Sequence, residues 1–235
     1  MINFTMKAAG QTVAVSAMFE STRDYCKQYI CQETPGFAIT ILPEDIALER
    51  KKSAGNYSDA YLETIALQRK ITEVLFDYDT LLFHGSLIAV DGVGYLFTAK
   101  SGTGKSTHTR LWRELLGDRA VMVNDDKPFL RITRGAVQAY GSPWNGKHGL
   151  GNHISVPLKA ICLLERGKEN QIQKIPAKEA VFMLLQQSSR PADLQRMPKY
   201  MELLDGLSES VEFYRMQCNM DPEVAKVAFE AMSQQ

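Results

Sequence analysis

The apolar residues of the chain change their spacing along its length. Over residues 59–76 they recur mainly at helical spacing, which predicts a strong amphipathic helix. The stretches before it predict a short hairpin, a hydroxyl-capped helix and a strand. These lie at residues 2–7 with 11–18, at 21–32 and at 37–42. The first third is therefore expected to be a small region of helices and strands.

A different pattern begins near residue 81. Apolar runs at 81–90 and 94–99 predict two strands joined by a tight turn at Asp91-Gly92-Val93. A glycine-rich loop then leads to a predicted helix at 105–116, which Gly117 ends. Further strands are predicted at residues 120–123, 129–133, 136–140 and 159–165.

The last third is predicted to be mostly helical. Helices are expected at residues 178–187, 193–206 and 222–232, with one strand at 211–218. The whole pattern predicts an α/β fold, with a mixed β-sheet flanked by helices. Residues 81–235 would form the main domain, and residues 1–80 an N-terminal α+β addition.

The composition narrows the class of protein. The chain has 235 residues, 45% of them hydrophobic and 23% charged, which is an ordinary globular composition. Lys and Arg together number 27, as do Asp and Glu, so no net charge favours nucleic acid or an anionic membrane as a partner. The four cysteines form no C-x-x-C pair, and neither a signal peptide nor a run of 18 apolar residues is found. A cytoplasmic location with free thiols is expected.

The strongest chemical signal is a glycine-rich loop between an apolar strand and a helix, the context of a P-loop. Its amide groups and the helix N-terminus would point at an anion. Lys105 would reach the β- and γ-phosphates of ATP, and the Ser106 hydroxyl could ligate Mg²⁺. Ala99 stands where the strict motif has glycine, and it is small enough for the loop to close. The predicted phosphate-binding residues are Ser101, Gly102, Thr103, Gly104, Lys105, Ser106 and Thr107.

Two adjacent carboxylates, Asp125 and Asp126, end the predicted strand that follows. A carboxylate at the end of a strand beside a P-loop is the usual partner of Mg²⁺. Two of them allow a division of labour, in which one holds the metal and the other accepts a proton from a hydroxyl. The alternative interpretation is a solvated turn.

Five motifs follow one another along the chain: Phe83-His84-Gly85-Ser86, the turn at 91–94, the loop at 101–106, Asn124-Asp125-Asp126 and the tail at 211–218. Their order resembles the HPr kinase/phosphorylase family, within the phosphoenolpyruvate-carboxykinase-like group of P-loop proteins. The resemblance covers about residues 80–232.

The resemblance implies a kinase that uses ATP and Mg²⁺ and transfers a phosphate to a hydroxyl. In that family Lys105 would contact the phosphates, Ser106 and Asp126 would hold Mg²⁺, and Asp125 would be the general base. The roles of the two aspartates could be reversed. His84, the third predicted catalytic residue, would lie near the phosphates and Asp125 and tune the charge there. Because family members form hexamers, a homo-oligomer is also implied.

The chain departs from the family pattern after the acidic pair. The family signature Glu-x-Arg-Gly-x-Gly is absent, and in the nearest segment, 145–151, His148 stands where the arginine would be. Residues 1–80 do not match the family's regulatory domain. The chain is therefore read as a divergent member, and the phosphorylase half-reaction is not implied.

Three residues near the predicted site are candidate substrate contacts. Trp144 and Lys147 lie in a polar, glycine-rich loop, and Arg190 follows a predicted helix. A core position for Trp144 and a surface position for Arg190 are the alternatives. The leading hypothesis is a kinase acting on a serine of a small protein or peptide. A small-molecule phosphotransferase and a nucleotide-binding partner in peptide processing, with little turnover, stay open.

Overall fold

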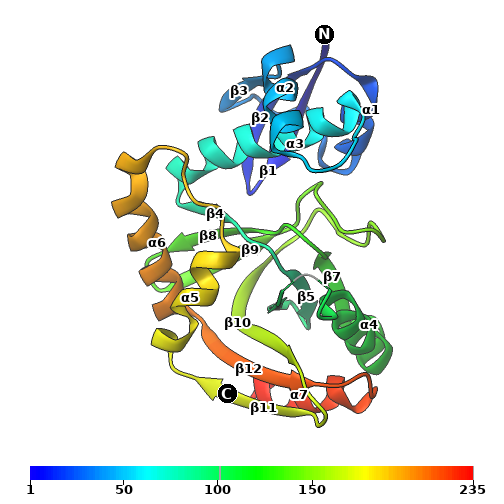
Figure 1. Cartoon of the computed structure of the whole chain (residues 1–235), viewed down its shortest axis with the longest axis vertical. Coiled ribbons are helices and arrows are strands. Elements are labelled where there is room, and N and C mark those ends of the chain that lie inside the picture. Colours follow the sequence, from blue (N-terminus) through cyan, green and yellow to red (C-terminus); the bar gives the residue numbers. More distant parts are fainter. Residues whose placement is uncertain (101, 235) are drawn as a thin grey trace. The chain divides into compact units, whose positions relative to one another are not determined.

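The structure is a computed structural model that describes residues 1–100 and 102–234. The chain divides into two compact units, Met1–Tyr78 and a second that begins at Asp79 (Figure 1). Within the described chain, every helix is too short or too polar to cross a bilayer.

The first unit contains a three-stranded sheet. Strands β1 (Ile2–Ala8) and β2 (Gln11–Ala17) pair antiparallel, and β3 (Phe37–Thr40) adds parallel to β2. The turn residues Ala9 and Gly10 both have positive φ, 47° and 75°. This is the type I′ geometry that matches the twist of a hairpin, so the predicted hairpin is confirmed.

Three helices accompany this sheet, α1 (Glu20–Tyr25), α2 (Pro43–Lys52) and α3 (Asp59–Leu75). The helix predicted at residues 21–32 is shorter, because a 3₁₀ turn follows Cys26 and Ile30 then bridges to Met6 of β1. Glu63 of α3 is fully buried and accepts hydrogen bonds from the amides of Met18 and Phe19. The start of α1 is thereby capped by a carboxylate from another helix.

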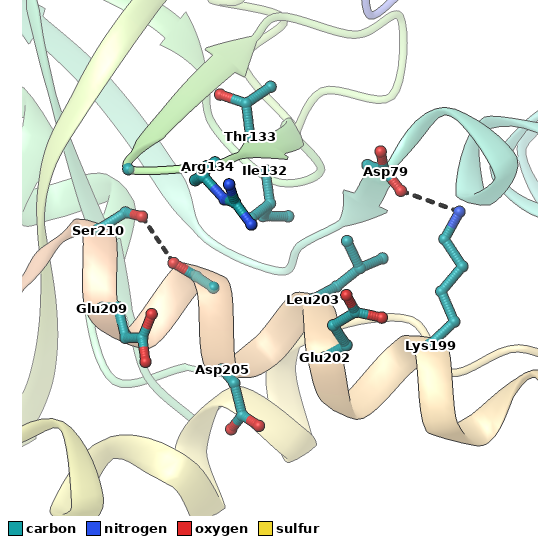
Figure 2. A pocket seen from close by; sticks show the side chains of 12 residues that line it. Asp79, Ile132, Thr133, Arg134, Lys199, Glu202, Leu203, Asp205, Glu209 and Ser210 are labelled. Carbon is teal, nitrogen blue, oxygen red and sulfur yellow. Dashed lines mark hydrogen bonds and ion pairs between the residues drawn. The ribbon is translucent and has the colours of Figure 1, made fainter.

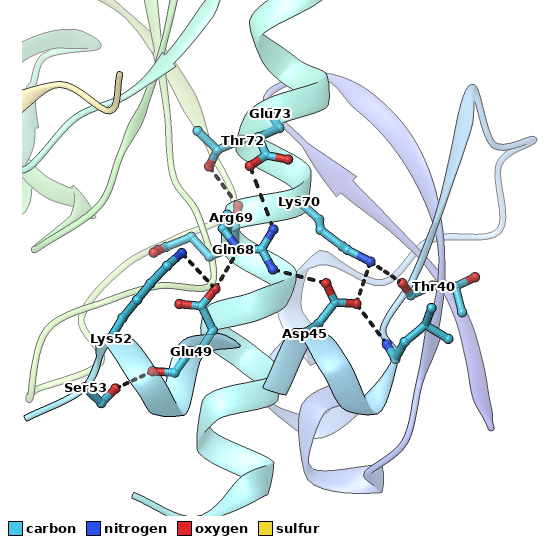
Figure 3. A network of polar contacts seen from close by, with 11 residues as sticks. Thr40, Asp45, Glu49, Lys52, Ser53, Gln68, Arg69, Lys70, Thr72 and Glu73 are labelled. Atoms are coloured by element: carbon cyan, nitrogen blue, oxygen red, sulfur yellow. Dashed lines mark hydrogen bonds and ion pairs between the residues drawn. The ribbon is translucent and has the colours of Figure 1, made fainter. Parts of the chain in front are cut away.

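A network of charged groups ties α2 to α3 (Figure 3). The Arg69 guanidinium donates to Glu49 at 2.5 Å and to Asp45 at 3.1 Å, and Lys70 donates to Asp45 at 2.5 Å. Burial raises the pKa of the Asp45 carboxyl, but hydrogen bonds from Lys70, the Leu42 amide and Arg69 outweigh it and lower that pKa overall. The Asp45 carboxylate is therefore held ionised by the two cations.

Replacing Arg69 with methionine should destabilise the chain by about 3 kcal/mol, because Glu49, only 5% exposed, would lose its main partner. Urea denaturation at neutral pH measures this loss. The control is Arg23→Met, which breaks an exposed pair with Glu20 and should cost a small fraction as much. Equal losses in the two variants would contradict the assignment.

The second unit is built on a nine-stranded mixed sheet. The order is β4-β8-β9-β10-β6-β5-β7, with β12 beside β10 and β11 beside β12. The long strand β10 joins two parts of the sheet, since its first residues pair with β9 and its later residues pair with β6 and β12 (Figure 1). The strands are β4 (Thr80–Leu82), β5 (Ser86–Val90), β6 (Val93–Thr98), β7 (Ala120–Asn124), β8 (Phe129–Thr133), β9 (Ala136–Tyr140), β10 (Ser155–Arg166), β11 (Gln171–Ile175) and β12 (Glu212–Cys218).

The strand predicted at residues 81–90 is two strands. β4 pairs with β8, whereas β5 pairs with β6 and β7. The strand is interrupted between them because three consecutive amides leave the sheet ladder. The amides of Phe83 and Gly85 donate to the carbonyls of Pro128 and Asp126, and the amide of His84 donates to the carbonyl of Gln187. This interruption places His84 beside the acidic pair.

Helix α4 (Lys105–Leu116) packs on the sheet together with α7 (Glu223–Ser233). Trp112 is fully buried and contacts the rings of Phe97, Tyr95 and Phe229, at centroid distances of 5.0, 5.3 and 5.5 Å. This aromatic group fixes the axis of α4 and thus the position of its first turn. The remaining helices are α5 (Ala177–Gln187) and α6 (Met197–Ser210).

Candidate functional site

The glycine-rich loop lies between β6 and α4, as the sequence predicted. Gly102 and Gly104 have φ of 77° and 118°, a region that only glycine enters without strain. Ala99 is fully buried, and its carbonyl accepts a hydrogen bond from the Lys105 ammonium at 3.3 Å. Ser101, one of the predicted phosphate contacts, lies outside the described residues.

Three groups able to carry positive charge surround one carboxylate near the start of α4. Burial lowers the pKa of Lys105, with Asp126 opposing that shift and Lys127 adding to it. The pKa of His84 falls to about 4 because of burial and the charges of Lys127 and Lys105, despite Asp126. His84 Nε2 lies 3.3 Å from Asp126 Oδ1. The cluster has an excess of positive charge and is suited to an anion.

Lys127 is a member of this cluster that the sequence analysis did not single out. Burial lowers its pKa, and Asp126 opposes the shift. The available signal was a lysine directly after two carboxylates. Its partial burial could not be read from the sequence, because it depends on the turn that follows β7.

Asn124 shapes that turn. Its buried side-chain oxygen accepts from the amides of Asp126 (2.9 Å) and Lys127 (2.6 Å), and its amide nitrogen donates to the Ser142 carbonyl at 3.0 Å. The two aspartates consequently have different neighbours. Asp126 is half-exposed beside His84, whereas Asp125 is 4% exposed and accepts a hydrogen bond from the Gly146 amide at 2.5 Å.

The loop that covers Asp125 is closely packed. A Cβ on Gly146 would lie 3.0 Å from Asp125 Oδ2, and one on Gly151 would lie 1.9 Å from Asn145 Oδ1. Glycine is therefore needed at both positions for close approach. The loop fixes the position of the Asp125 carboxylate through the Gly146 amide.

The three predicted substrate contacts have different surroundings. The burial of Trp144 corrects its predicted role: the side chain is only 3% exposed and packs edge-on against Phe129, so Trp144 is a core residue. Lys147 is exposed on the loop. Arg190 is also exposed, and its guanidinium donates to the Leu185 carbonyl at 3.2 Å.

Two cavities lie on opposite faces of α4. One, of about 580 Å³, is lined by the loop glycines and by His108 and Leu111 of the helix. The other, of about 410 Å³, is lined by Ser106, Arg110 and other residues of the opposite face. Residues three or four positions apart share a helix face, which explains this partition. Thr107 borders both cavities, so the first turn of α4 adjoins each of them.

A cavity of about 620 Å³ lies elsewhere in the second unit, between α6 and the turn that joins β8 to β9 (Figure 2). Glu202, Asp205 and Glu209 of α6 line it, with Arg134 opposite, and Lys199 pairs with Asp79 at 2.9 Å. None of the predicted site residues that the structure describes borders this cavity.

No group of three or more His, Cys, Asp or Glu side chains in the described ranges is arranged to hold a metal ion. A hard cation such as Mg²⁺ usually takes only one or two carboxylates and completes its shell with water and substrate phosphates. A metal at this site would therefore need an oxyanion ligand beside the protein groups.

Acid should destabilise the second unit through its buried histidine, His108. Burial lowers the pKa of His108 to about 3, so its stabilising neutral form is fully present above about pH 6.5 and is lost as the pH falls toward 3. At about 1.4 kcal/mol per pH unit, the loss between pH 7 and pH 5 is about 2 kcal/mol. His108→Phe should remove that part of the pH dependence in urea titrations. An unchanged dependence would contradict the assignment.

Comparison with known proteins gives a family and a distant structural likeness. The model of the family described as "SynChlorMet cassette protein ScmC" matches residues 52–226. No curated protein matches the sequence. Among solved structures, the Hpr(Ser) kinase/phosphatase from Coxiella burnetii is 10% identical, over 64% of this chain and 95% of that one, with a TM-score of 0.39. This is a distant fold similarity and no more.

Proposed function

The chain belongs to the ScmC family of SynChlorMet cassette proteins, and we propose that it is an ATP- and Mg²⁺-dependent phosphotransferase. The γ-phosphate of ATP would pass to a hydroxyl, that of a serine in a small protein or peptide. The single observation that supports this most is the charge cluster of Lys105, Lys127 and His84 around Asp126, directly behind a glycine-rich loop.

The residues present fit the phosphates of ATP. Gly102 and Gly104 leave open space above their Cα atoms, because a Cβ built on either would meet nothing within 4 Å. Amides at the start of α4 face outward without helical partners, as they do at any helix N-terminus. Lys105 and Lys127 supply the positive charge, and a phosphate beside them would favour the protonated form of His84.

The nucleoside fits the cavity of about 580 Å³ beside the loop. Its lining combines apolar side chains, Leu111 and Met220, with the ring of His108. His108 Nε2 is buried, and no described residue donates to it. Arg166 closes one side, since its guanidinium donates to the Gly102 carbonyl at 2.7 Å. A base or ribose with a donor group would satisfy the histidine.

Ser106 and Asp126 are the residues proposed to hold Mg²⁺, together with phosphate oxygens. The metal would supply charge neutralisation on the phosphates during transfer. Asp126 is half-exposed and pairs with His84, so it can exchange that partner for a cation. Asp125 is less suited to a metal because one of its oxygens is already held by the Gly146 amide.

Asp125 is proposed to be the general base. Its Oδ2 would accept the proton of the acceptor hydroxyl while that oxygen bonds to the γ-phosphorus. The bond from this phosphorus to the bridging oxygen of ADP breaks, and its electron pair leaves with ADP. The hydrogen bond from Gly146 to Oδ1 fixes the carboxylate so that Oδ2 is the available base.

Calorimetric titration of the purified chain with ATP, with and without Mg²⁺, tests this proposal. Binding that is strengthened by Mg²⁺ would support the site. Absence of binding at millimolar ATP would contradict it and would favour a partner protein that does not use nucleotide.

A further inference from the structure

We propose that the cavity of about 410 Å³ on α4 receives an acidic peptide carrying the acceptor serine, and that Arg110 and Arg113 select this peptide by charge. This inference rests on the proposed phosphotransferase function and specifies its acceptor.

The cavity is built from one face of α4 and from the loop after β9. The helix contributes Ser106, Arg110 and Arg113, and the loop contributes His148 and Leu150. Asp125, the proposed base, completes the lining. An acceptor bound here would approach the phosphate loop from the side opposite to the nucleoside cavity, so the donor and the acceptor would not compete for space.

The carboxylate of Asp125 itself points to a ligand. Its Oδ2 is buried and accepts no hydrogen bond from any described residue, although the side chain is only 4% exposed. A buried carboxylate oxygen without a donor is costly, and a serine hydroxyl would satisfy it. The Gly146 amide already donates to the other oxygen, Oδ1, so Oδ2 is the one left for the hydroxyl.

The two arginines determine the chemistry of the acceptor. Arg113 is half-buried, with its Nε buried and unpartnered in the part of the chain that the structure describes. Arg110 pairs with the exposed Glu114, one turn further along α4, and such surface pairs are weak. Among the residues that line the cavity are thus two arginines and one carboxylate, that of Asp125. Carboxylates flanking the serine are the complement, since arginine binds them bidentately.

Three synthetic serine peptides of equal length test the inference, with flanking residues that are Asp/Glu, Asn/Gln or Lys. Phosphate transfer from γ-labelled ATP is measured for each peptide. We expect the acidic peptide to have a KM about tenfold lower than the Asn/Gln peptide, the factor of one charge-assisted hydrogen bond. Arg113→Glu should remove this advantage and shift the preference toward the Lys peptide. Arg113→Gln should remove the advantage alone.

The control variant is Arg119→Glu, which changes an exposed arginine paired with Asp91 and should leave the peptide preference intact. ATP binding is measured separately by calorimetry. ATP binding without preference among the peptides would overturn this inference and leave the proposed function standing. Equal transfer to free serine, or loss of ATP binding in Arg113→Gln, would also overturn it. Absence of ATP binding in the unaltered chain would overturn both.

Discussion

Replacing Lys105 with alanine should weaken the Mg²⁺-dependent binding of ATP more than any other single change proposed for this site. Lys105 is half-buried at the first position of α4. Its ammonium group donates a hydrogen bond to the Ala99 carbonyl at 3.3 Å, and the charges of Asp126 and Lys127 affect its pKa. A phosphate at this place would lose one of the two half-buried lysines of the charge cluster, so the Kd for ATP should rise at least about a hundredfold. Calorimetry on the variant and the unaltered chain measures the difference.

Two further lysines make this result interpretable. Lys226→Ala removes an exposed lysine of α7 and should leave ATP affinity unchanged. Lys127→Ala should weaken binding, because Lys127 belongs to the same charge cluster, but by less than Lys105→Ala, since it lies outside the loop. If Lys105→Ala bound ATP as well as the unaltered chain, the phosphate-loop assignment would be wrong.

The sequence predicted the framework of this site because local signals agree there. The apolar run of β6 and the helix pattern of α4 both stand out, and α4 has the predicted bounds, Lys105–Leu116. The turn at Asp91-Gly92 was predictable for the same reason, since positive φ at both residues suits aspartate followed by glycine. The mixed sheet flanked by helices also follows from this alternation of elements.

Features set by long-range contacts could not be predicted. Residues 81–90 look like one apolar run, yet hydrogen bonds to Asp126, Pro128 and Gln187 divide the run into β4 and β5. The sequence of β11 is largely polar, and this segment forms a strand because β12 pairs with it. The burial of Trp144 and the inclusion of Lys127 in the charge cluster likewise depend on how the loop after β9 packs on β7.

The different surroundings of the two aspartates predict different losses of function. Asp125→Asn should lower kcat by about a hundredfold to ten-thousandfold, because the amide cannot accept the hydroxyl proton. Its ATP affinity should stay near that of the unaltered chain, since Asn can still accept the Gly146 amide through its side-chain oxygen. Transfer to the acidic serine peptide and calorimetry with Mg²⁺-ATP measure the two quantities.

Asp126→Asn is the matched control, since it makes the same chemical change one residue away. It removes the partner of His84 and a proposed ligand of Mg²⁺, so it should weaken Mg²⁺-dependent ATP binding as well as transfer. The pair of variants separates proton transfer from metal binding only if their effects differ. Equal loss of ATP binding in both would make Asp125 a metal or folding residue. Loss of transfer alone in Asp126→Asn, with transfer retained in Asp125→Asn, would reverse the two roles.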